Sequence, residues 1–206
     1  MPEESRPRPA TDFHHDRFTQ ISESHCGPAV IVMLLHYLGI EVTQEAVAEA
    51  GGAVDQIELN GMRVDQLERA VRQLAPQSRF WYKAHATIEE LVQVVNTYHY
   101  PVGIEWQGLF EDSLEDEVED GDYGHYSVVL MADSGNQQLA IVDPYKDFRL
   151  QDRILTFDFF GSRWWDMNEV HDPLTGESRL VEDRQMMFLI APEEETFPRR
   201  LGMKSE

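Results

Sequence analysis

The sequence contains little cysteine, little lysine and no long apolar run. Cys26 is the single cysteine among 206 residues, so no internal disulfide can form. Because small domains outside the cell usually rely on disulfides, this composition indicates a cytoplasmic protein. The longest nearly apolar run, Ala29 to Leu38, is too short to span a bilayer, and the N-terminal residues lack the apolar core of a signal peptide. We therefore expect no membrane segment.

Positive charge is also scarce. The chain has 17 basic against 38 acidic residues, a net charge of -21, and its only lysines are Lys83, Lys146 and Lys204. A surface of this sign repels phosphate groups, which argues against nucleic acid and anionic membranes as partners. The composition suits a high-salt cytoplasm and a basic substrate equally well, so it does not distinguish between them.

The remaining composition is that of a folded protein. Hydrophobic residues make up 42% of the chain and aromatic residues 10%, which is enough for one sizeable core at this length. Residues 1–12 are polar and proline-rich, which predicts a flexible arm. We expect a single domain over residues 13–192 and a polar C-terminal tail over residues 193–206, and we find no internal repeat.

A buried helix is predicted near the N-terminus. Pro28 has no amide hydrogen and is tolerated only in the first turn of a helix, so the helix begins around His25 to Gly27. The run from Ala29 to Leu38 is apolar on nearly every side, which is typical of a helix surrounded by protein, and Gly39 ends it. This helix carries Cys26 at its start.

The other predicted elements are helices in the first half and strands in the second. Thr87 and Glu90 have the spacing of a capping box, and the period of the pattern changes to two after residue 123. We expect an α+β fold in which the helical part packs on a C-terminal antiparallel β-sheet. The expected helices span 43–50, 64–75 and 87–98, the expected strands span 79–83, 101–106, 125–132, 139–142, 148–154 and 185–190, and an aromatic stretch spans 157–165.

Cys26 has the position of a nucleophile. The N-terminus of a helix is the positive end of its dipole, which favours a thiolate over a thiol. The alternative is a lone cysteine that serves as a small buried apolar residue. Position alone does not decide between the two.

The predicted hairpin supplies a base and a group to orient it. A three-residue loop centred on Ser134, with Gly135 in the left-handed conformation, places His125 directly opposite Asp143. Opposed residues of an antiparallel pair have Cβ atoms about 4.5–5.5 Å apart, within reach of an imidazole–carboxylate hydrogen bond. The alternative is a histidine at a strand end followed by an ordinary Asp-Pro turn.

Gln20 is the candidate oxyanion donor. It lies in a polar segment shortly before Cys26, and a side-chain amide that folds back beside a helix N-terminus can join the main-chain amide of Cys26 in donating to an oxyanion. A solvated glutamine in a polar loop is the alternative.

Four short segments together resemble a known family. They are Gln20-Ile-Ser-Glu-Ser-His-Cys26-Gly-Pro-Ala29, His36-Tyr-Leu-Gly39, Gly124-His125-Tyr-Ser-Val-Val129 and Ile141-Val-Asp143-Pro144. In this order they resemble the bacteriocin-processing, double-glycine-leader peptidases and their stand-alone relatives in the papain-like cysteine peptidase superfamily. The resemblance covers about residues 18–145 and implies a papain-like fold. It further implies four roles, with Cys26 as nucleophile, His125 as general base and acid, Asp143 as orienter and Gln20 as oxyanion donor.

The chain departs from this family at two points. Many relatives have an acidic residue directly before the nucleophile, where this chain has His25. No transmembrane or nucleotide-binding segment follows the peptidase-like part, so the form fused to an exporter is not expected, and leader removal during export is not implied.

Two further features admit a cation or a basic ligand. Eight of the twelve residues 111–122 are acidic, and this segment leads toward His125. It could select a basic peptide, bind a cation such as calcium, or form a solvated loop. It lacks the strict calcium-loop pattern. His14, His15 and His25 lie near Cys26, but their spacing matches no standard zinc pattern. We expect no metal and no cofactor.

The sequence therefore predicts a thiol hydrolase that cleaves a peptide or amide bond, with basic peptides as one option for the substrate. An acyltransferase would form the same thioester and pass it to an amine instead of water. A catalytically silent peptide-binding module on the same fold is the third possibility. The sequence leaves the oligomeric state open.

Overall fold

The computed structural model describes residues 17–108, 124–171 and 177–205. The predicted arm 1–12, the acidic segment 111–122, and His14 and His15 lie outside these ranges. At the centre is α1 (Cys26–Tyr37), in which every residue except His36 is buried. Pro28 lies in its first turn, and Gly39 follows its end with a φ of +77°. The predicted start, burial and end of this helix are confirmed.

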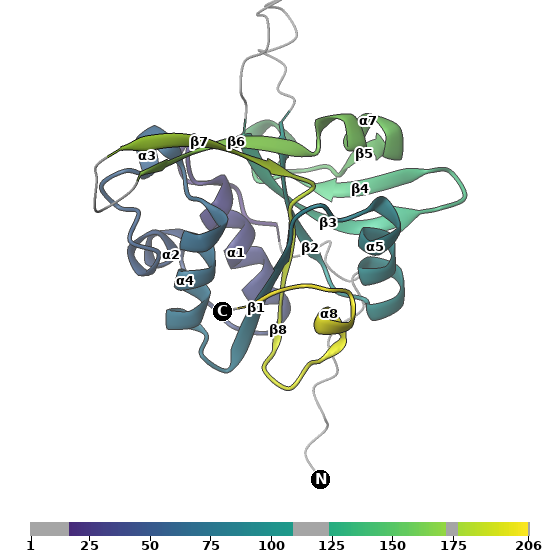
Figure 1. Cartoon of the computed structure of the whole chain (residues 1–206), viewed down its shortest axis with the longest axis horizontal. Coiled ribbons are helices and arrows are strands. Elements are labelled where there is room, and N and C mark those ends of the chain that lie inside the picture. Colours follow the sequence, from purple (N-terminus) through teal and green to yellow (C-terminus); the bar gives the residue numbers. More distant parts are fainter. Residues whose placement is uncertain (1–16, 109–123, 172–176, 206) are drawn as a thin grey trace, which may run out of the picture.

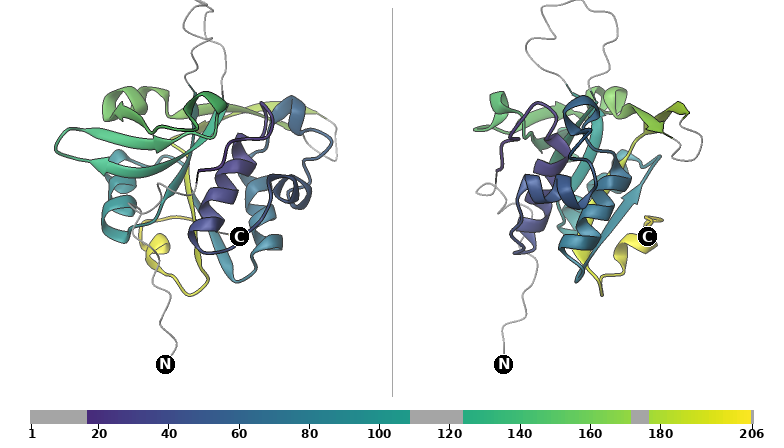
Figure 2. Two further views of the ribbon diagram at one scale, coloured as in Figure 1. Left: turned by 180° about the vertical axis from the view of Figure 1, so that it is seen from behind. Right: turned by 90° about the vertical axis from the view of Figure 1, so that its left-hand side faces the viewer.

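A helical layer surrounds α1 on one side of the molecule (Figure 1). Helices α2 (Gln44–Ala50) and α4 (Val64–Leu74) pack against α1 and against each other, and the short α3 (Ile57–Asn60) precedes α4. The Thr43 hydroxyl accepts a hydrogen bond from the main chain of α2, so the predicted N-terminus of that helix is confirmed. Figure 2 shows α1, α2 and α4 side by side from two further directions.

The second half of the chain completes one antiparallel sheet with the order β1-β8-β2-β3-β4-β5. The late strand β8 lies between the two earliest strands, so both halves of the chain share one sheet and one core. The mixed helical and antiparallel architecture confirms the expected α+β class. The strands are β1 (Ser78–Lys83), β2 (Val102–Gln107), β3 (Gly124–Asp133), β4 (Gln138–Val142), β5 (Arg153–Thr156) and β8 (Met187–Pro192).

The other side of the sheet is covered by α5 and α8 (Figure 1). Helix α5 (Ile88–Gln93) begins with the predicted capping box and continues as the π-helical turn η2 (Val94–Tyr98). The segment expected as a polar tail contains α8 (Phe197–Arg200). There the ring of Phe197 is buried and stacks on Tyr98 at 4.1 Å between centroids.

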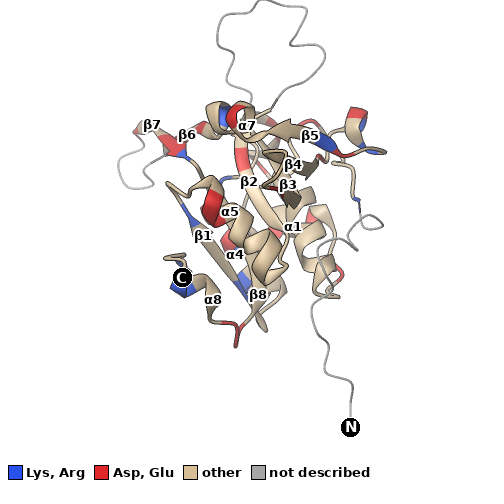
Figure 3. Cartoon of the chain, turned by 90° about the vertical axis from the view of Figure 1, so that its right-hand side faces the viewer, with Lys and Arg blue, Asp and Glu red and all other residues tan. Residues whose placement is uncertain are grey.

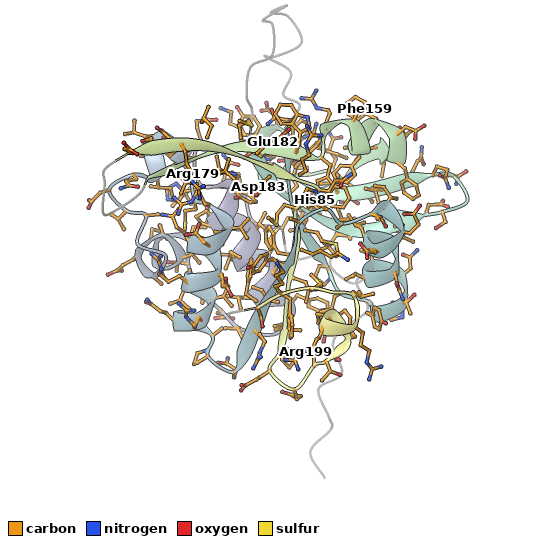
Figure 4. The ribbon with its side chains drawn as sticks, viewed as in Figure 1. His85, Phe159, Arg179, Glu182, Asp183 and Arg199 are labelled. Carbon is orange, nitrogen blue, oxygen red and sulfur yellow. The ribbon has the colours of Figure 1, made fainter. Side chains whose placement is uncertain are left out.

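A second, two-stranded sheet was not predicted. It consists of β6 (Trp165–His171) and β7 (Ser178–Arg184) and crosses the top of the molecule in Figure 1. Figure 4 labels Arg179, Glu182 and Asp183 on β7. These strands are largely polar, so the apolar alternation that identifies a half-buried strand is absent from them.

The turn between β3 and β4 differs from the expected three-residue loop. The Asp133 carboxylate accepts hydrogen bonds from the main-chain amides of Gly135 and Asn136, which builds a longer turn over residues 134–137. The left-handed residue is Gln137, with a φ of +56°, and not Gly135. The expected loop was wrong because the Asp133 carboxylate binds the two main-chain amides that follow it and so favours the longer turn.

The predicted strand 148–154 is also corrected. After β4 the chain makes a short 3-10 turn, η3 (Lys146–Phe148), and re-enters the sheet only at Arg153. Leu150 is 85% exposed, so its apolar side chain contributes nothing to the core. The aromatic stretch after β5 forms α7 (Phe157–Arg163), whose first turn is capped by the hydroxyl of Thr156.

Candidate active site

Cys26 lies at the first residue of α1, where the unpaired N–H groups of a helix gather. It is buried, with 8% of its surface exposed, and it lines a cleft of about 350 Å³. Because the rest of α1 is packed inside the protein, the thiol is held at the floor of this cleft. The predicted position of Cys26 at a helix N-terminus is confirmed.

The cleft has two walls from distant parts of the chain. One wall comes from the segment around α3 and the start of α4 and includes Leu59, and the other comes from the β6–β7 sheet and includes Leu180. Leu59 is 84% and Leu180 is 69% exposed, so the rim of the cleft is partly apolar. Tyr126 of β3 lies with Cys26 on the cleft surface. The unpredicted second sheet is therefore part of the site.

His125 and Asp143 are in contact. The imidazole Nε2 of His125 lies 2.7 Å from Oδ1 of Asp143, and both side chains are buried. The predicted register pairs Val128 with Ala140, whereas the observed register pairs Val128 with Val142. A displacement of two residues keeps every side chain on its own face, so His125 and Asp143 still share one face of the sheet although they are not directly opposed.

The charges around His125 favour the imidazolium. Burial by itself lowers the pKa of His125, but the Asp143 carboxylate and a hydrogen bond and charge from Cys26 outweigh it and raise the pKa well above the usual range. For Asp143, burial raises the pKa, but the charge and hydrogen bond of His125, the charge of Arg153 and a hydrogen bond from the main chain of Tyr145 leave it below the usual range. Since Nε2 is bound to Asp143, Nδ1 is the nitrogen left to face the thiol.

Arg153 is a member of this cluster that the sequence did not reveal. Its Nη1 donates to Oδ2 of Asp143 at 2.5 Å, and the main-chain amide of Tyr145 donates to Oδ1 at 2.9 Å. No pattern in the sequence marks Arg153, because its contact with Asp143 depends on the path of the chain between β4 and β5. Only the spacing from Asp143 to the next strand could have suggested it.

Gln20 lies beside this cluster but is turned toward its own loop. Its main-chain amide donates to the carbonyl of Pro144 at 2.9 Å. Its side-chain Nε2 donates to the carbonyls of Ser22 and Glu23 at 2.8 and 3.0 Å, while the buried Oε1 has no hydrogen-bond partner among the described residues. Nε2 would have to leave these carbonyls to reach an oxyanion, so the donor role of Gln20 stays a prediction.

His25 is hydrogen-bonded within the segment that precedes Cys26. Its Nδ1 lies 2.6 Å from the Ser22 hydroxyl, which in turn donates to a carboxylate oxygen of Glu58 at 3.1 Å. This chain of contacts ties the segment before Cys26 to α3. Within the described ranges no group of three or more His, Cys, Asp or Glu side chains is arranged to hold a metal ion.

A buried acid lies under the cleft. The Oε1 atom of Glu105 accepts hydrogen bonds from the Tyr126 hydroxyl at 2.5 Å and from Asn168 at 3.2 Å. Burial raises the pKa of Glu105 to about 7, with Asp183 nearby adding to the rise and the Tyr126 hydrogen bond opposing it. Glu105 thus joins β2, β3 and β6 directly behind the cleft.

The fold and the cleft define a papain-like α+β protein with a thiol at the start of its central helix and a histidine–carboxylate pair on its sheet. A family model, the Peptidase_C39 like family, matches residues 14–172. The chain belongs to this family, so the predicted resemblance is confirmed. No helix in the described part of the chain is long and apolar enough to cross a membrane.

A solved structure with a TM-score above 0.5 shows the same fold. The peptidase domain of Streptococcus ComA, a bi-functional ABC transporter involved in a quorum sensing pathway, is 20% identical with a TM-score of 0.55, over 85% of this chain and 97% of that domain. The N-terminal peptidase C39 like domain of a toxin secretion ATP-binding protein from Vibrio parahaemolyticus is 11% identical with a TM-score of 0.44, over 84% and 99% of the two chains. None of the curated proteins is a detectable relative in sequence.

Proposed function

We propose that the protein is a thiol hydrolase that cleaves a peptide or amide bond. The observation that carries the proposal is the contact of a buried carboxylate with an imidazole that in turn interacts with a thiol at a helix N-terminus, where the thiol lines an open cleft. Membership of a peptidase-like family supports a peptide as the substrate.

The geometry supports one order of events. Nδ1 of His125 takes the thiol proton, and the sulfur of Cys26 attacks the carbonyl carbon to form a tetrahedral intermediate. His125 then protonates the leaving amine, and the intermediate collapses to a thioester. A water molecule gives its proton to His125 and attacks the thioester, which releases the acid and restores the thiol.

The other residues stabilise charge and orientation. Asp143 accepts from Nε2 of His125, which selects the tautomer with an unprotonated Nδ1 and stabilises the imidazolium. The main-chain amide of Cys26 donates to the oxyanion, and Nε2 of Gln20 joins it after the amide turns away from Ser22 and Glu23.

The proposal is tested by incubating the protein with a mixed peptide library and identifying new termini by mass spectrometry. We expect cleavage by the wild type and none by Cys26→Ser at equal thermal stability. Peptide binding without cleavage and without enhanced thiol reactivity would instead identify a silent binding module. Adding an amine such as hydroxylamine separates hydrolysis from acyl transfer, because an acyltransferase would form the amide or hydroxamate in preference to the acid.

A further inference from the structure

The two oxygen atoms of Asp143 have different partners. Oδ1 accepts from Nε2 of His125 at 2.7 Å and from the main-chain amide of Tyr145 at 2.9 Å, whereas Oδ2 accepts from Nη1 of Arg153 at 2.5 Å. The Asp143 side chain has no exposed surface. Arg153 is thus the charged partner of Oδ2 among the described contacts.

Arg153 is itself held in place by aromatic rings. Its side chain is 8% exposed, and its guanidinium carbon lies 4.1 Å from the ring centroid of Phe148 and 5.1 Å from that of Trp106. Trp106 is paired with His125 across β2 and β3, and its indole N–H donates to Ser127 at 3.0 Å. The guanidinium is thus fixed against a ring that is the neighbour of His125 in the sheet.

This arrangement answers two physical demands. A carboxylate rotates easily about its last side-chain bond, so a hydrogen bond on one oxygen alone orients it poorly. A buried carboxylate is also costly unless a positive group compensates it, and His125 is neutral during part of the proposed cycle. Arg153 stays charged throughout and makes a hydrogen bond that fixes the carboxylate plane.

We propose that Arg153 is a positioning residue, which holds Asp143 ionised and oriented so that the carboxylate accepts the hydrogen bond of His125. Its consequence for turnover rests on the proposed function, but the effect on the His125–Asp143 hydrogen bond does not. The resulting unit contains the side chains of five residues, Trp106, His125, Asp143, Phe148 and Arg153. Phe148 lies between β4 and β5, and Arg153 is the first residue of β5.

The test uses Arg153→Met, Arg153→Lys and the control Arg149→Met, which changes an exposed arginine of the same segment. With a cleaved peptide, we expect Arg153→Met to lower kcat by about 10- to 100-fold with KM within about twofold, as is typical of residues that orient a reacting group. The acidic limb of the kcat profile should move to higher pH, because Asp143 loses a positive neighbour. Lysine keeps the charge without the planar contact with the rings, so Arg153→Lys should give a smaller loss, and Arg149→Met should equal the wild type.

A second readout is independent of activity. In a proton NMR spectrum the Nε2 hydrogen of His125 should give a low-field resonance, which is assigned by its absence in His125→Ala. We expect this resonance to be lost or strongly shifted in Arg153→Met and kept in Arg149→Met. If the wild type cleaves no peptide, the proposed function fails, while loss of the resonance still supports the positioning role.

An unchanged kcat and an unchanged low-field resonance in folded Arg153→Met would overturn the inference. If Arg153→Met does not fold, Arg153→Lys decides. A reduced kcat or an altered resonance at unchanged melting temperature supports the role, and wild-type values for both contradict it.

Discussion

At Cys26, the proposed chemistry depends on the position of the residue in the fold and not on residue type alone. The thiol lies at the positive end of a buried helix and next to an imidazole whose pKa is raised by Asp143. In the proposed mechanism His125 accepts the proton of the Cys26 thiol, and a thiolate is the reactive form of a cysteine nucleophile. We therefore expect the reactivity of Cys26 to depend on the assembled site.

We expect iodoacetamide to alkylate Cys26 near neutral pH about 10-fold or more faster than an ordinary free thiol. His125→Ala should slow the reaction, since the thiolate loses its positive partner. The rate is measured by mass spectrometry of the intact protein. His85→Asn is a suitable control, because His85 is exposed and has a φ of +54°, a conformation that asparagine tolerates. Equal rates in the wild type and His125→Ala would rule out the ion pair.

For Asp143→Asn we expect the fold to be retained and turnover to fall by about 10²- to 10⁴-fold, because an amide no longer selects the correct tautomer of His125. The measurement is kcat/KM together with a thermal melt. Asp147→Asn changes an exposed aspartate nearby and should leave turnover unaltered. Normal turnover in Asp143→Asn would mean that another group orients the imidazole.

Between elements, the buried acid Glu105 connects the main sheet to the β6–β7 sheet. It lies on β2 and accepts hydrogen bonds from Tyr126 of β3 and from Asn168 of β6. Only 1% of its surface is exposed. This contact places one wall of the cleft relative to the floor. We therefore expect its protonation state to affect the stability of the fold.

The free energy of unfolding should fall as the pH rises from about 4.5 to about 7, through the contribution of Glu105. Its pKa is about 7 in the folded protein against 4.5 as the ordinary value, so in this interval the folded state holds a proton that the unfolded chain has released. Glu105→Gln should abolish this contribution, which is at most about 3 kcal/mol for a shift of this size. Urea unfolding of both proteins at several pH values gives the difference, and parallel curves would show that Glu105 does not titrate in this interval.

Two glycines offer a matched test of packing. A Cβ on Gly103 of β2 would lie 2.2 Å from the ring of Phe188, which is fully buried and stacks on Phe80. We expect Gly103→Ala to destabilise the protein by about 1–3 kcal/mol. A Cβ on Gly161 of α7 meets nothing within 4 Å, so Gly161→Ala should stabilise by about 0.5–1 kcal/mol. Thermal melts measure both, and a neutral Gly103→Ala would show that the sheet adapts at this point.

For the whole molecule, the dominant property is its net charge of -21. Figure 3 shows acidic and basic positions distributed over several elements of the described structure. Ion pairs such as Lys83–Glu90 and Arg79–Glu193 join some of them, but the acidic excess remains uncompensated. Self-repulsion of this kind opposes the compact state and is weakened by salt.

If the surface is adapted to high salt, we expect the melting temperature to rise with the concentration of potassium chloride. The rise should continue beyond the concentration at which charge screening is complete. The Debye length is already about 10 Å at about 0.1 M salt, so later increases report more than screening. Neutralising Glu115, Asp116, Glu117, Glu119 and Asp120 should then leave KM for a Lys/Arg-rich peptide unchanged. A flat melting temperature with a raised KM would instead favour recognition of basic substrates by this segment.

Local chemistry in the sequence determined most of the framework. Pro28 and Gly39 mark the two ends of α1, and the spacing of Thr87 and Glu90 marks the start of α5, because these signals act within a few residues. The pairing of His125 with Asp143 was also accessible, since the two-residue period of strands puts them on one face even when the register is displaced.

Only the tertiary structure decided what depends on distant segments. The contact of Arg153 with Asp143 requires a particular path between β4 and β5, and the wall of the cleft requires a polar hairpin whose own pattern shows no buried face. The orientation of the Gln20 amide is likewise set by carbonyl groups of its folded loop. Residue types and periodicity specify which side chains can react, but their partners are chosen by packing between segments that the sequence alone does not bring together.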